Sequence, residues 1–306
     1  MMKLSNRVLE MEESVTLAAS ARAAELKAEG RDILSLTLGE PDFTTPENIQ
    51  KAAIAAIQDG KASFYTAASG LPALKDAISS YMETFYGYAV PRNQVVVATG
   101  AKFILYAAFA TLLNPGDEVI IPTPCWVSYV DQVKMVDGVP VTFQTTEAND
   151  FKATVEQLEA ARTEKTKLIL LNSPSNPTGM IYSREELEAI GAWALEHDIL
   201  ILADDIYGRL VYNGHEFTAI SSLSDALRKQ TIVVNGVSKT YAMTGWRVGF
   251  AVAEPDIIAG MAKIISQTTS NLTAVSQYAA IEALTGDQSS IETMRQAFEE
   301  RLNTIY

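Results

Sequence analysis

Two basic side chains stand eight residues apart in the segment 236–249, which reads GVSKTYAMTGWRVG. Lys239 follows the apolar run 231–234, so we expect it in a loop just after a buried strand. A lysine shielded from water and close to other cationic charge has a depressed pKa and can act as an amine nucleophile. Arg247 offers planar, bidentate donors to a phosphate. An ordinary surface loop with two basic residues is the alternative that these residues alone leave open.

Two further polar segments follow apolar runs. Residues 202–207 read LADDIY, and a buried carboxylate there could keep a pyridine nitrogen protonated, which turns its ring into an electron sink. An Asp-Asp pair after a strand can equally be a turn or a helix cap. Residues 172–179 read NSPSNPTG, where proline and glycine can fix the loop for purely structural reasons.

A possible anion site lies in residues 98–102, ATGAK, which join a predicted strand to a predicted helix. Backbone N–H groups at a helix N-terminus attract anions, although an ordinary strand-to-helix turn has the same pattern. The turn is neither a Walker loop nor a Rossmann glycine triplet. Three further residues have ordinary structural explanations when taken alone. Trp126 would be a core residue, Tyr65 a core or surface packing residue, and Gly39 a turn glycine.

The elements that must position these residues alternate between short β-branched runs and helical stretches. Helical periodicity covers 103–113, 155–161 and 183–196, and Ser183 with Glu186 forms a potential capping box. Residues 11–30 are expected to form a helix that ends at Gly30, 33–38 a short strand, and the last 50 residues mainly helices. Buried strands are predicted at 95–98, 118–121, 139–143, 168–171, 199–203, 231–234 and 248–252. This alternation predicts an α/β fold with a mainly parallel sheet, whose ligands gather beyond the carboxyl ends of the strands.

Composition excludes several classes of function. The 306 residues include 24 Lys and Arg against 37 Asp and Glu, a net charge of −13, which disfavours nucleic-acid and anionic-membrane partners. Cys125 is the single cysteine, and only two histidines occur, so an intrachain disulfide is impossible and a metal centre is not expected. A cytoplasmic location fits best, with no signal peptide and no transmembrane segment expected.

The segment around Lys239 resembles the cofactor-attachment signature of class I pyridoxal-phosphate (PLP) aminotransferases, of the aspartate and aromatic aminotransferase family. The other motifs occur in family order, so the resemblance covers essentially the whole chain. It implies the fold type I of PLP-dependent transferases, with a mixed central sheet flanked by helices and pyridoxal 5'-phosphate as the cofactor. It also implies a homodimer that acts on small amino acids and 2-oxo acids.

The resemblance assigns a role to each candidate residue. Lys239 would form an imine with the cofactor and move protons, Asp204 would pair with the pyridinium nitrogen, and Asp205 is expected to be structural. Arg247 would bind the cofactor phosphate, whereas Ser238 is a weaker candidate because Gly236 replaces the hydroxyl residue that many relatives carry. The remaining assignments are Gly100, Ala101 and Lys102 around the phosphate, Tyr207 and Asn176 on the ring's phenolic oxygen, Trp126 stacked on the ring, Gly39 beside the substrate carboxylate, and Tyr65 reaching the cofactor of the partner subunit.

The implied reaction transfers the amino group of an L-amino acid to a 2-oxo acid, with aspartate and 2-oxoglutarate favoured. In one branch of the family a lysine at the position of Lys102 binds the distal carboxylate of the substrate. Besides Lys102, the residues Gly39, Trp126 and Asn176 are expected to contact the substrate. Aromatic or prephenate-type substrates, a C–S lyase of the same fold, and a chain that binds PLP without turnover remain open alternatives.

Three parts are expected along the chain. Residues 1–45 would form the N-terminal part of a small domain, 46–290 the large PLP-binding domain, and 291–306 the start of the C-terminal small domain, whose remainder is absent. In the family, that remainder carries the arginine that binds the substrate α-carboxylate. Neither Arg295 nor Arg301 matches its motif.

Overall fold

A computed structural model describes residues 4–9, 11, 15–37 and 39–305. At its centre is one mixed sheet with the strand order β1-β7-β6-β5-β4-β2-β3. β7 pairs antiparallel with both β1 and β6, whereas the other neighbours pair in parallel. The strands are β1 (Val95–Thr99), β2 (Glu118–Thr123), β3 (Val139–Gln144), β4 (Thr166–Asn172), β5 (Leu200–Asp204), β6 (Thr231–Gly236) and β7 (Val248–Val252). All seven predicted strands are confirmed.

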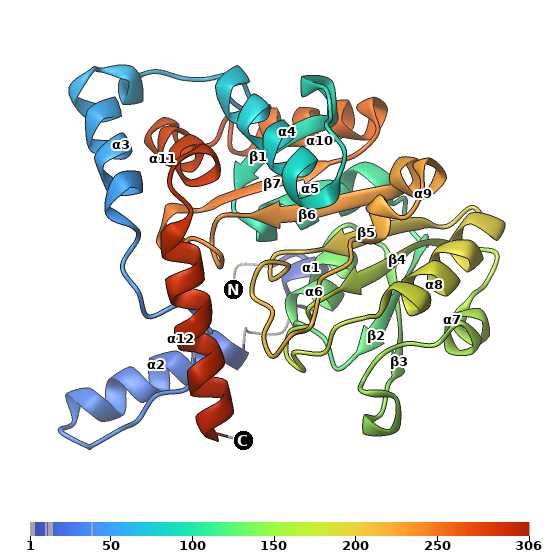
Figure 1. Ribbon diagram of the computed structural model, residues 1–306. Coiled ribbons are helices and arrows are strands. Elements are labelled where there is room, and N and C mark those ends of the chain that lie inside the picture. Colours follow the sequence, from blue (N-terminus) through green and yellow to red (C-terminus); the bar gives the residue numbers. More distant parts are fainter. Residues whose placement is uncertain (1–3, 10, 12–14, 38, 306) are drawn as a thin grey trace.

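Helices cover both faces of this sheet (Figure 1). Because side chains alternate across a strand, Val96 and Ala98 of β1 pack on one face and Val95 and Val97 on the other. The first face packs against α5 (Ala101–Leu112), α6 (Ser128–Met135) and α10 (Pro255–Thr268). The second packs against α3 (Glu47–Gln58), α4 (Pro72–Tyr86), α11 (Ala274–Thr285), α7 (Val155–Ala161), α8 (Arg184–Glu196) and α9 (Asp225–Gln230). The predicted architecture, a mainly parallel sheet flanked by helices, is confirmed.

Short 3-10 turns connect these elements, and local sequence explains where α8 begins. The Ser183 hydroxyl accepts a hydrogen bond from the Glu186 N–H at 3.2 Å, and the Glu186 carboxylate accepts one from the Ser183 N–H at 2.7 Å. This reciprocal pair is the predicted capping box. The 3-10 turns are η1 (Lys61–Ser63), η2 (Arg92–Gln94), η3 (Glu147–Asn149), η4 (Ile220–Ser222) and η5 (Thr244–Trp246).

The two ends of the chain lie outside these helical layers (Figure 1). They contain α1 (Asn6–Leu9), α2 (Val15–Ala28) and α12 (Ser289–Ile305), so the helical predictions for both ends hold in the described residues. The strand predicted at 33–38 is wrong for the described residues 33–37, and Leu38 lies outside them. Leu34 and Leu36 are 87% and 88% exposed, and the sheet formed by the described residues contains no strand from this segment.

No helix in the described part of the chain is long and apolar enough to cross a membrane.

Candidate active site

The sheet topology brings the predicted site residues to one edge. β4, β5 and β6 are parallel and end there, which places Asn172, Asp204 and Gly236 at the same edge. β7 runs in the opposite direction and begins there, directly after Arg247. β1 runs antiparallel to β7, so it also ends at this edge, just before Gly100.

Lys239 lies three residues beyond the end of β6 and is half-buried. Its Nζ donates a hydrogen bond to the Gly39 carbonyl at 2.5 Å. Burial lowers the pKa of the Lys239 amine; the charge of Glu40 raises it, that of Arg247 lowers it further, and that of Asp204 raises it. A lowered pKa increases the fraction of neutral, nucleophilic amine near neutral pH.

Asp204, the last residue of β5, is only 3% exposed. Its Oδ2 accepts a hydrogen bond from the Tyr129 hydroxyl at 2.8 Å, and its Oδ1 accepts one from the Ile206 N–H at 3.3 Å. Burial raises the pKa of Asp204 to about 6, against the opposing effects of these two hydrogen bonds and the charge of Lys239. The carboxylate is therefore ionised at neutral pH and well placed to attract a cation.

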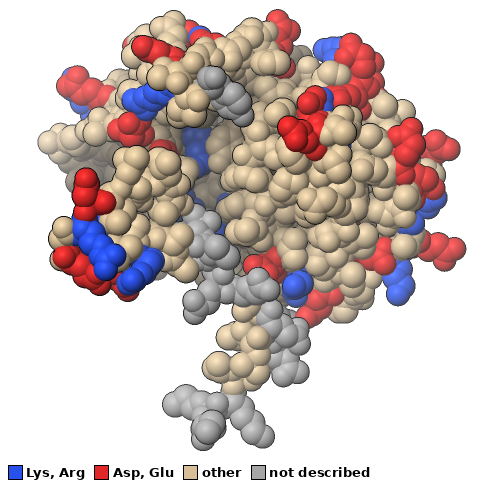
Figure 2. Space-filling view, turned by 90° about the horizontal axis from the view of Figure 1, so that it is seen from below, with Lys and Arg blue, Asp and Glu red and all other residues tan. Residues whose placement is uncertain are grey.

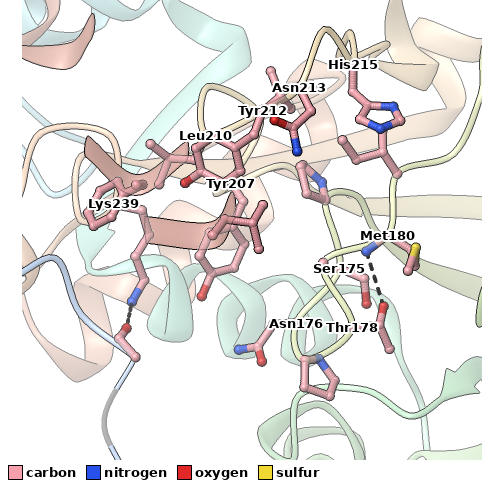
Figure 3. Close-up of a pocket in the computed structure, with 18 of the residues that line it drawn as sticks. Ser175, Asn176, Thr178, Met180, Tyr207, Leu210, Tyr212, Asn213, His215 and Lys239 are labelled. Carbon is pink, nitrogen blue, oxygen red and sulfur yellow. Dashed lines mark hydrogen bonds between the residues drawn. The ribbon is translucent and has the colours of Figure 1, made fainter. Parts of the chain in front are cut away.

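Tyr207 and Asn176 extend toward the same space as Lys239 (Figure 3). The Lys239 Nζ lies 5.7 Å from the centroid of the Tyr207 ring. Burial and the nearby charge of Asp204 raise the pKa of Tyr207 to about 12, although a hydrogen bond with Asn176 opposes this shift. The Tyr207 phenol thus remains a protonated donor, and the Asn176 amide provides a second polar group beside it.

The N-terminus of α5 and Arg247 form a corner suited to an anion. Gly100 precedes α5 with a φ of +82°, and a Cβ at this position would collide with the Arg247 guanidinium. A Cβ on Gly249 would likewise collide with the backbone of Gly100 and Ala101. Since the first N–H groups of a helix lack intrahelical acceptors, Ala101 and Lys102 present free backbone donors next to the guanidinium.

Lys102 and Trp126 pair near this corner. The Lys102 Nζ lies 4.8 Å from the Trp126 ring centroid, and partial burial, together with the charge of Arg247, lowers the pKa of Lys102. The Trp126 ring also packs edge-on against Tyr129, with the centroids 5.3 Å apart. A cation and a flat aromatic face therefore stand together close to Asp204.

A cavity of about 740 Å³ opens over Lys239, and its lining includes four predicted site residues, Gly39, Asn176, Tyr207 and Lys239. This volume is in the range of small-molecule sites. The space-filling view shows a recess with basic side chains inside it, on a face with many acidic groups (Figure 2). Anionic ligands would thus find local positive charge despite the net charge of −13.

The other predicted site residues, among them Asp204, Lys102 and Arg247, do not line this cavity, and the roles of Tyr65 and Ser238 stay predictions. The Tyr65 side chain is 91% exposed, and Tyr65 is not among the described residues that line the cavity. Ser238 is 7% exposed, and its buried position beside Lys239 leaves little surface for a ligand in this conformation.

Two residues that sequence reasoning did not select also contact the site. Tyr129 hydrogen-bonds Asp204, and Asn172 hydrogen-bonds both the Asp204 carbonyl and the Asn176 N–H. They lie three and four residues from Trp126 and Asn176 respectively. Tyr129 reaches Asp204 from α6 and Asn172 reaches it from β4, so only the folded structure reveals these contacts.

Comparison with known proteins places this geometry in a family. An asparagine–oxo-acid transaminase from Streptococcus mutans is 74% identical over 306 residues, which cover all of this chain and 78% of that protein. An aspartate aminotransferase from Bacillus sp. (strain YM-2) is 52% identical over 99% of this chain and 77% of its own length.

Solved structures of aminotransferases resemble this chain as well. The aspartate aminotransferase of Rhizobium meliloti superposes with a TM-score of 0.95 at 42% identity, over 98% of this chain and 75% of that one. The Thermus thermophilus aspartate aminotransferase with maleate superposes with a TM-score of 0.94 at 38% identity, over 98% of this chain and 78% of that one. The sequence profile of aminotransferase class I and II matches residues 31–306. With the lysine, carboxylate and anion corner assembled at one sheet edge, the chain belongs to the class I and II aminotransferases.

Proposed function

We propose that this aminotransferase takes the amino group of L-aspartate and passes it to 2-oxoglutarate, with L-asparagine as a second donor. The observation that carries the choice of donor is Lys102, whose Nζ stands over the Trp126 ring at 4.8 Å. A lysine is a point charge with three donors, so it can bind a carboxylate or a carboxamide oxygen at the end of a short side chain.

The cofactor of this family is pyridoxal 5'-phosphate. The described residues fit it at three points. The corner of Gly100 and Arg247 suits the phosphate, the buried Asp204 carboxylate suits a protonated ring nitrogen, and the Lys239 amine suits the aldehyde. The cofactor supplies the carbonyl carbon that takes up the substrate amine and a ring that withdraws electrons from the substrate α-carbon.

The side chains then have separate tasks. Asp204, whose pKa of about 6 favours the ionised form at neutral pH, would keep the ring nitrogen protonated, while Tyr207 and Asn176 would hydrogen-bond the oxygen on the ring. The Lys239 Nζ would accept the proton that leaves the substrate α-carbon and would deliver it to the cofactor carbon that has taken up the amine. Its lowered pKa supports this task, because the neutral amine is the form that accepts a proton.

Substrate names among the relatives support both donors. The Streptococcus mutans relative is named for asparagine, the Bacillus relative for aspartate, and the Thermus structure is titled as containing maleate. Aspartate and maleate carry a second carboxylate, and asparagine carries an amide of the same shape. Relatives named aspartate/prephenate aminotransferase are more distant, at 46% identity.

Kinetics of a Lys102→Gln variant test this proposal. A bond between an amine and a charged group contributes about 1.5–3 kcal/mol, so KM for aspartate should rise roughly 10- to 100-fold. KM for asparagine should change by less than about threefold, because glutamine can still hydrogen-bond an amide. Lys134→Gln, on the exposed surface of α6, is the matched control. Equal changes for both donors would contradict this role of Lys102, and release of pyruvate and ammonia from a cysteine conjugate would favour a C–S lyase.

We also propose that the active form is a homodimer in which Tyr65 reaches the partner's cofactor. Exposed apolar side chains support it: Phe64 and Tyr65 are 76% and 91% exposed, and Ile54 and Ile57 of α3 are exposed nearby in the sequence. Such a patch favours a protein interface. Sedimentation should give twice the chain mass, and Tyr65→Ala should weaken cofactor binding; a monomer with full cofactor affinity would contradict the proposal.

The parts of the chain are assigned as the sequence predicts. We propose that 1–45 and 291–306 belong to a small domain and 46–290 to the large domain. The position of α2 and α12 outside the helical layers supports this division (Figure 1). A cytoplasmic location is proposed because the single cysteine, Cys125, cannot form an intrachain disulfide.

A further inference from the structure

The side-chain amide of Asn172 connects three segments at the active-site edge of the sheet. Asn172 is the last residue of β4 and lies opposite Asp204 of β5 in the strand register. Its Nδ2 donates to the Asp204 carbonyl at 2.8 Å, and its Oδ1 accepts from the Asn176 N–H at 2.7 Å. The amide nitrogen thus faces one strand and the amide oxygen faces the loop, which fixes its orientation.

Besides this contact, Asn176 hydrogen-bonds Tyr207 through its side chain, and most of the other hydrogen bonds of its loop lie within the loop. Between β4 and α8, the Ser175 N–H donates to the Met180 carbonyl at 2.9 Å and the Gly179 N–H to the Ser175 carbonyl at 2.8 Å. These bonds close a turn within the loop without fixing it to the sheet. Of the bonds described for Asn176, the one from its N–H to Asn172 holds its backbone to β4, close to Asp204.

We infer that Asn172 is a positioning residue, which sets the distance between Asn176 and Asp204 without touching the cofactor itself. The inference rests on the proposed function, in which Asn176 and Asp204 would contact two different polar groups of the cofactor, the ring oxygen and the ring nitrogen. An ordered pair of groups needs a rigid support, because small displacements of a binding group cost affinity and rate. Asn172 provides that support through one planar amide.

Gln230 offers a matched control at the opposite end of the sheet. Its Nε2 donates to the carbonyls of Ala194 and Ile199, at 2.8 and 2.7 Å, near the start of β5. Gln230→Ala therefore also removes two side-chain hydrogen bonds, both of them donated, whereas Asn172→Ala removes one donated and one accepted bond. Both variants should lose a similar amount of stability. A difference between them at the active site will therefore reflect where the hydrogen bonds lie in the fold and not a general loss of stability.

Hydrogen exchange of the cofactor-free protein directly tests the hydrogen bond between the Asn172 side chain and the Asn176 N–H. In Asn172→Ala the Asn176 amide should exchange about 10-fold faster, as expected when one hydrogen bond is lost, whereas Gln230→Ala should leave it unchanged. Asn172→Asp separates the two hydrogen bonds of the Asn172 side chain. The new carboxylate still accepts a hydrogen bond from the Asn176 N–H but cannot donate one to the Asp204 carbonyl. Protection of Asn176 should therefore survive in Asn172→Asp. Exchange in Asn172→Ala that matches the wild-type protein would overturn the inference.

Titration with pyridoxal 5'-phosphate then tests the functional consequence. The dissociation constant should rise about 10-fold in Asn172→Ala and stay within about twofold in Gln230→Ala. A rise of equal size in both variants would overturn the positioning role. Asn176→Ala and Asp204→Asn, titrated with the same cofactor, test the proposed function separately. If neither variant alters cofactor affinity or absorption, the proposed site is wrong. The hydrogen-exchange result still decides whether Asn172 holds the Asn176 backbone.

Discussion

Replacing Asp204 with asparagine should make the cofactor-free protein more stable at neutral pH while lowering its transaminase turnover. The reason is the cost of a buried charge. Asp204 is 3% exposed, and burial raises its pKa to about 6 from the usual 3.8. Asparagine has nearly the same shape, remains neutral, and can still accept the hydrogen bond from Tyr129.

The magnitude follows from proton linkage. The folded pKa is raised, so between pH 3.8 and about 6 the folded protein binds more protons than the unfolded chain, and stability falls as pH rises through this window. Each pH unit across the window is worth about 1.4 kcal/mol, so ionised Asp204 costs about 3 kcal/mol at pH 7. Losing the 3.3 Å bond from the Ile206 N–H offsets about 1 kcal/mol of the gain. We expect a net gain of about 2 kcal/mol at pH 7 and less than about 1 kcal/mol at pH 5.

Urea unfolding of the cofactor-free protein at pH 5 and pH 7 measures both values. Thr231→Val is the control: Thr231 is 2% exposed, and its hydroxyl donates a hydrogen bond to the Leu227 carbonyl at 2.6 Å. Because neither threonine nor valine titrates, this replacement should have nearly the same effect at both pH values. A gain for Asp204→Asn that is independent of pH, or a loss at pH 7, would refute the reasoning.

Three further substitutions test other contacts. Tyr129→Phe removes the 2.8 Å bond to Asp204 and should lower the unfolding free energy by about 1–3 kcal/mol at pH 7 and by less at pH 5, as denaturant titrations at the two pH values would reveal. Gly249→Ala should reduce stability by more than about 2 kcal/mol and weaken binding of PLP, because its Cβ would collide with the Gly100 and Ala101 backbone; unchanged melting and cofactor affinity would exclude this close approach. Gln277→Leu removes the acceptor of the Leu71 N–H, at 2.8 Å, and should cost about 1–3 kcal/mol in thermal or chemical unfolding; a neutral effect would mean that water replaces the amide.

Much of the fold could be predicted from the sequence because its strands are short and apolar, and most of them are buried, with β3 as the exposed exception. The run VVVAT of β1 is hydrophobic on both faces, which is typical of a sheet covered by helices on both sides. The cap of α8 was also readable, since Ser183 and Glu186 interact within one turn. Local interactions leave a local signal in the sequence.

The remainder depends on contacts between distant segments. Residues 33–37 have a strand-like composition, but a strand needs a neighbour to pair with, and Leu34 and Leu36 are exposed instead. Tyr129 and Asp204 are separated by 75 residues and meet only when α6 packs against the sheet. The same holds for Asn172, whose amide reads as an ordinary loop residue until β5 lies beside it. Spacing within a motif carries no information about such pairs.

The single antiparallel strand explains how Lys239 and Arg247 can serve one site although they are only eight residues apart. A parallel successor to β6 would need a crossover of a dozen or more residues, which would carry the chain to the far edge of the sheet before it returned. β7 instead turns back at once, in register with Gly236 opposite Gly249. The connecting loop therefore keeps the amine and the guanidinium at the same edge, with Gly249 against the start of α5. Because β1 pairs with the other side of β7, the helix N-terminus that follows Gly100 reaches the same place. Reversal of one strand thus gathers three elements of the proposed cofactor site that a uniformly parallel sheet would separate.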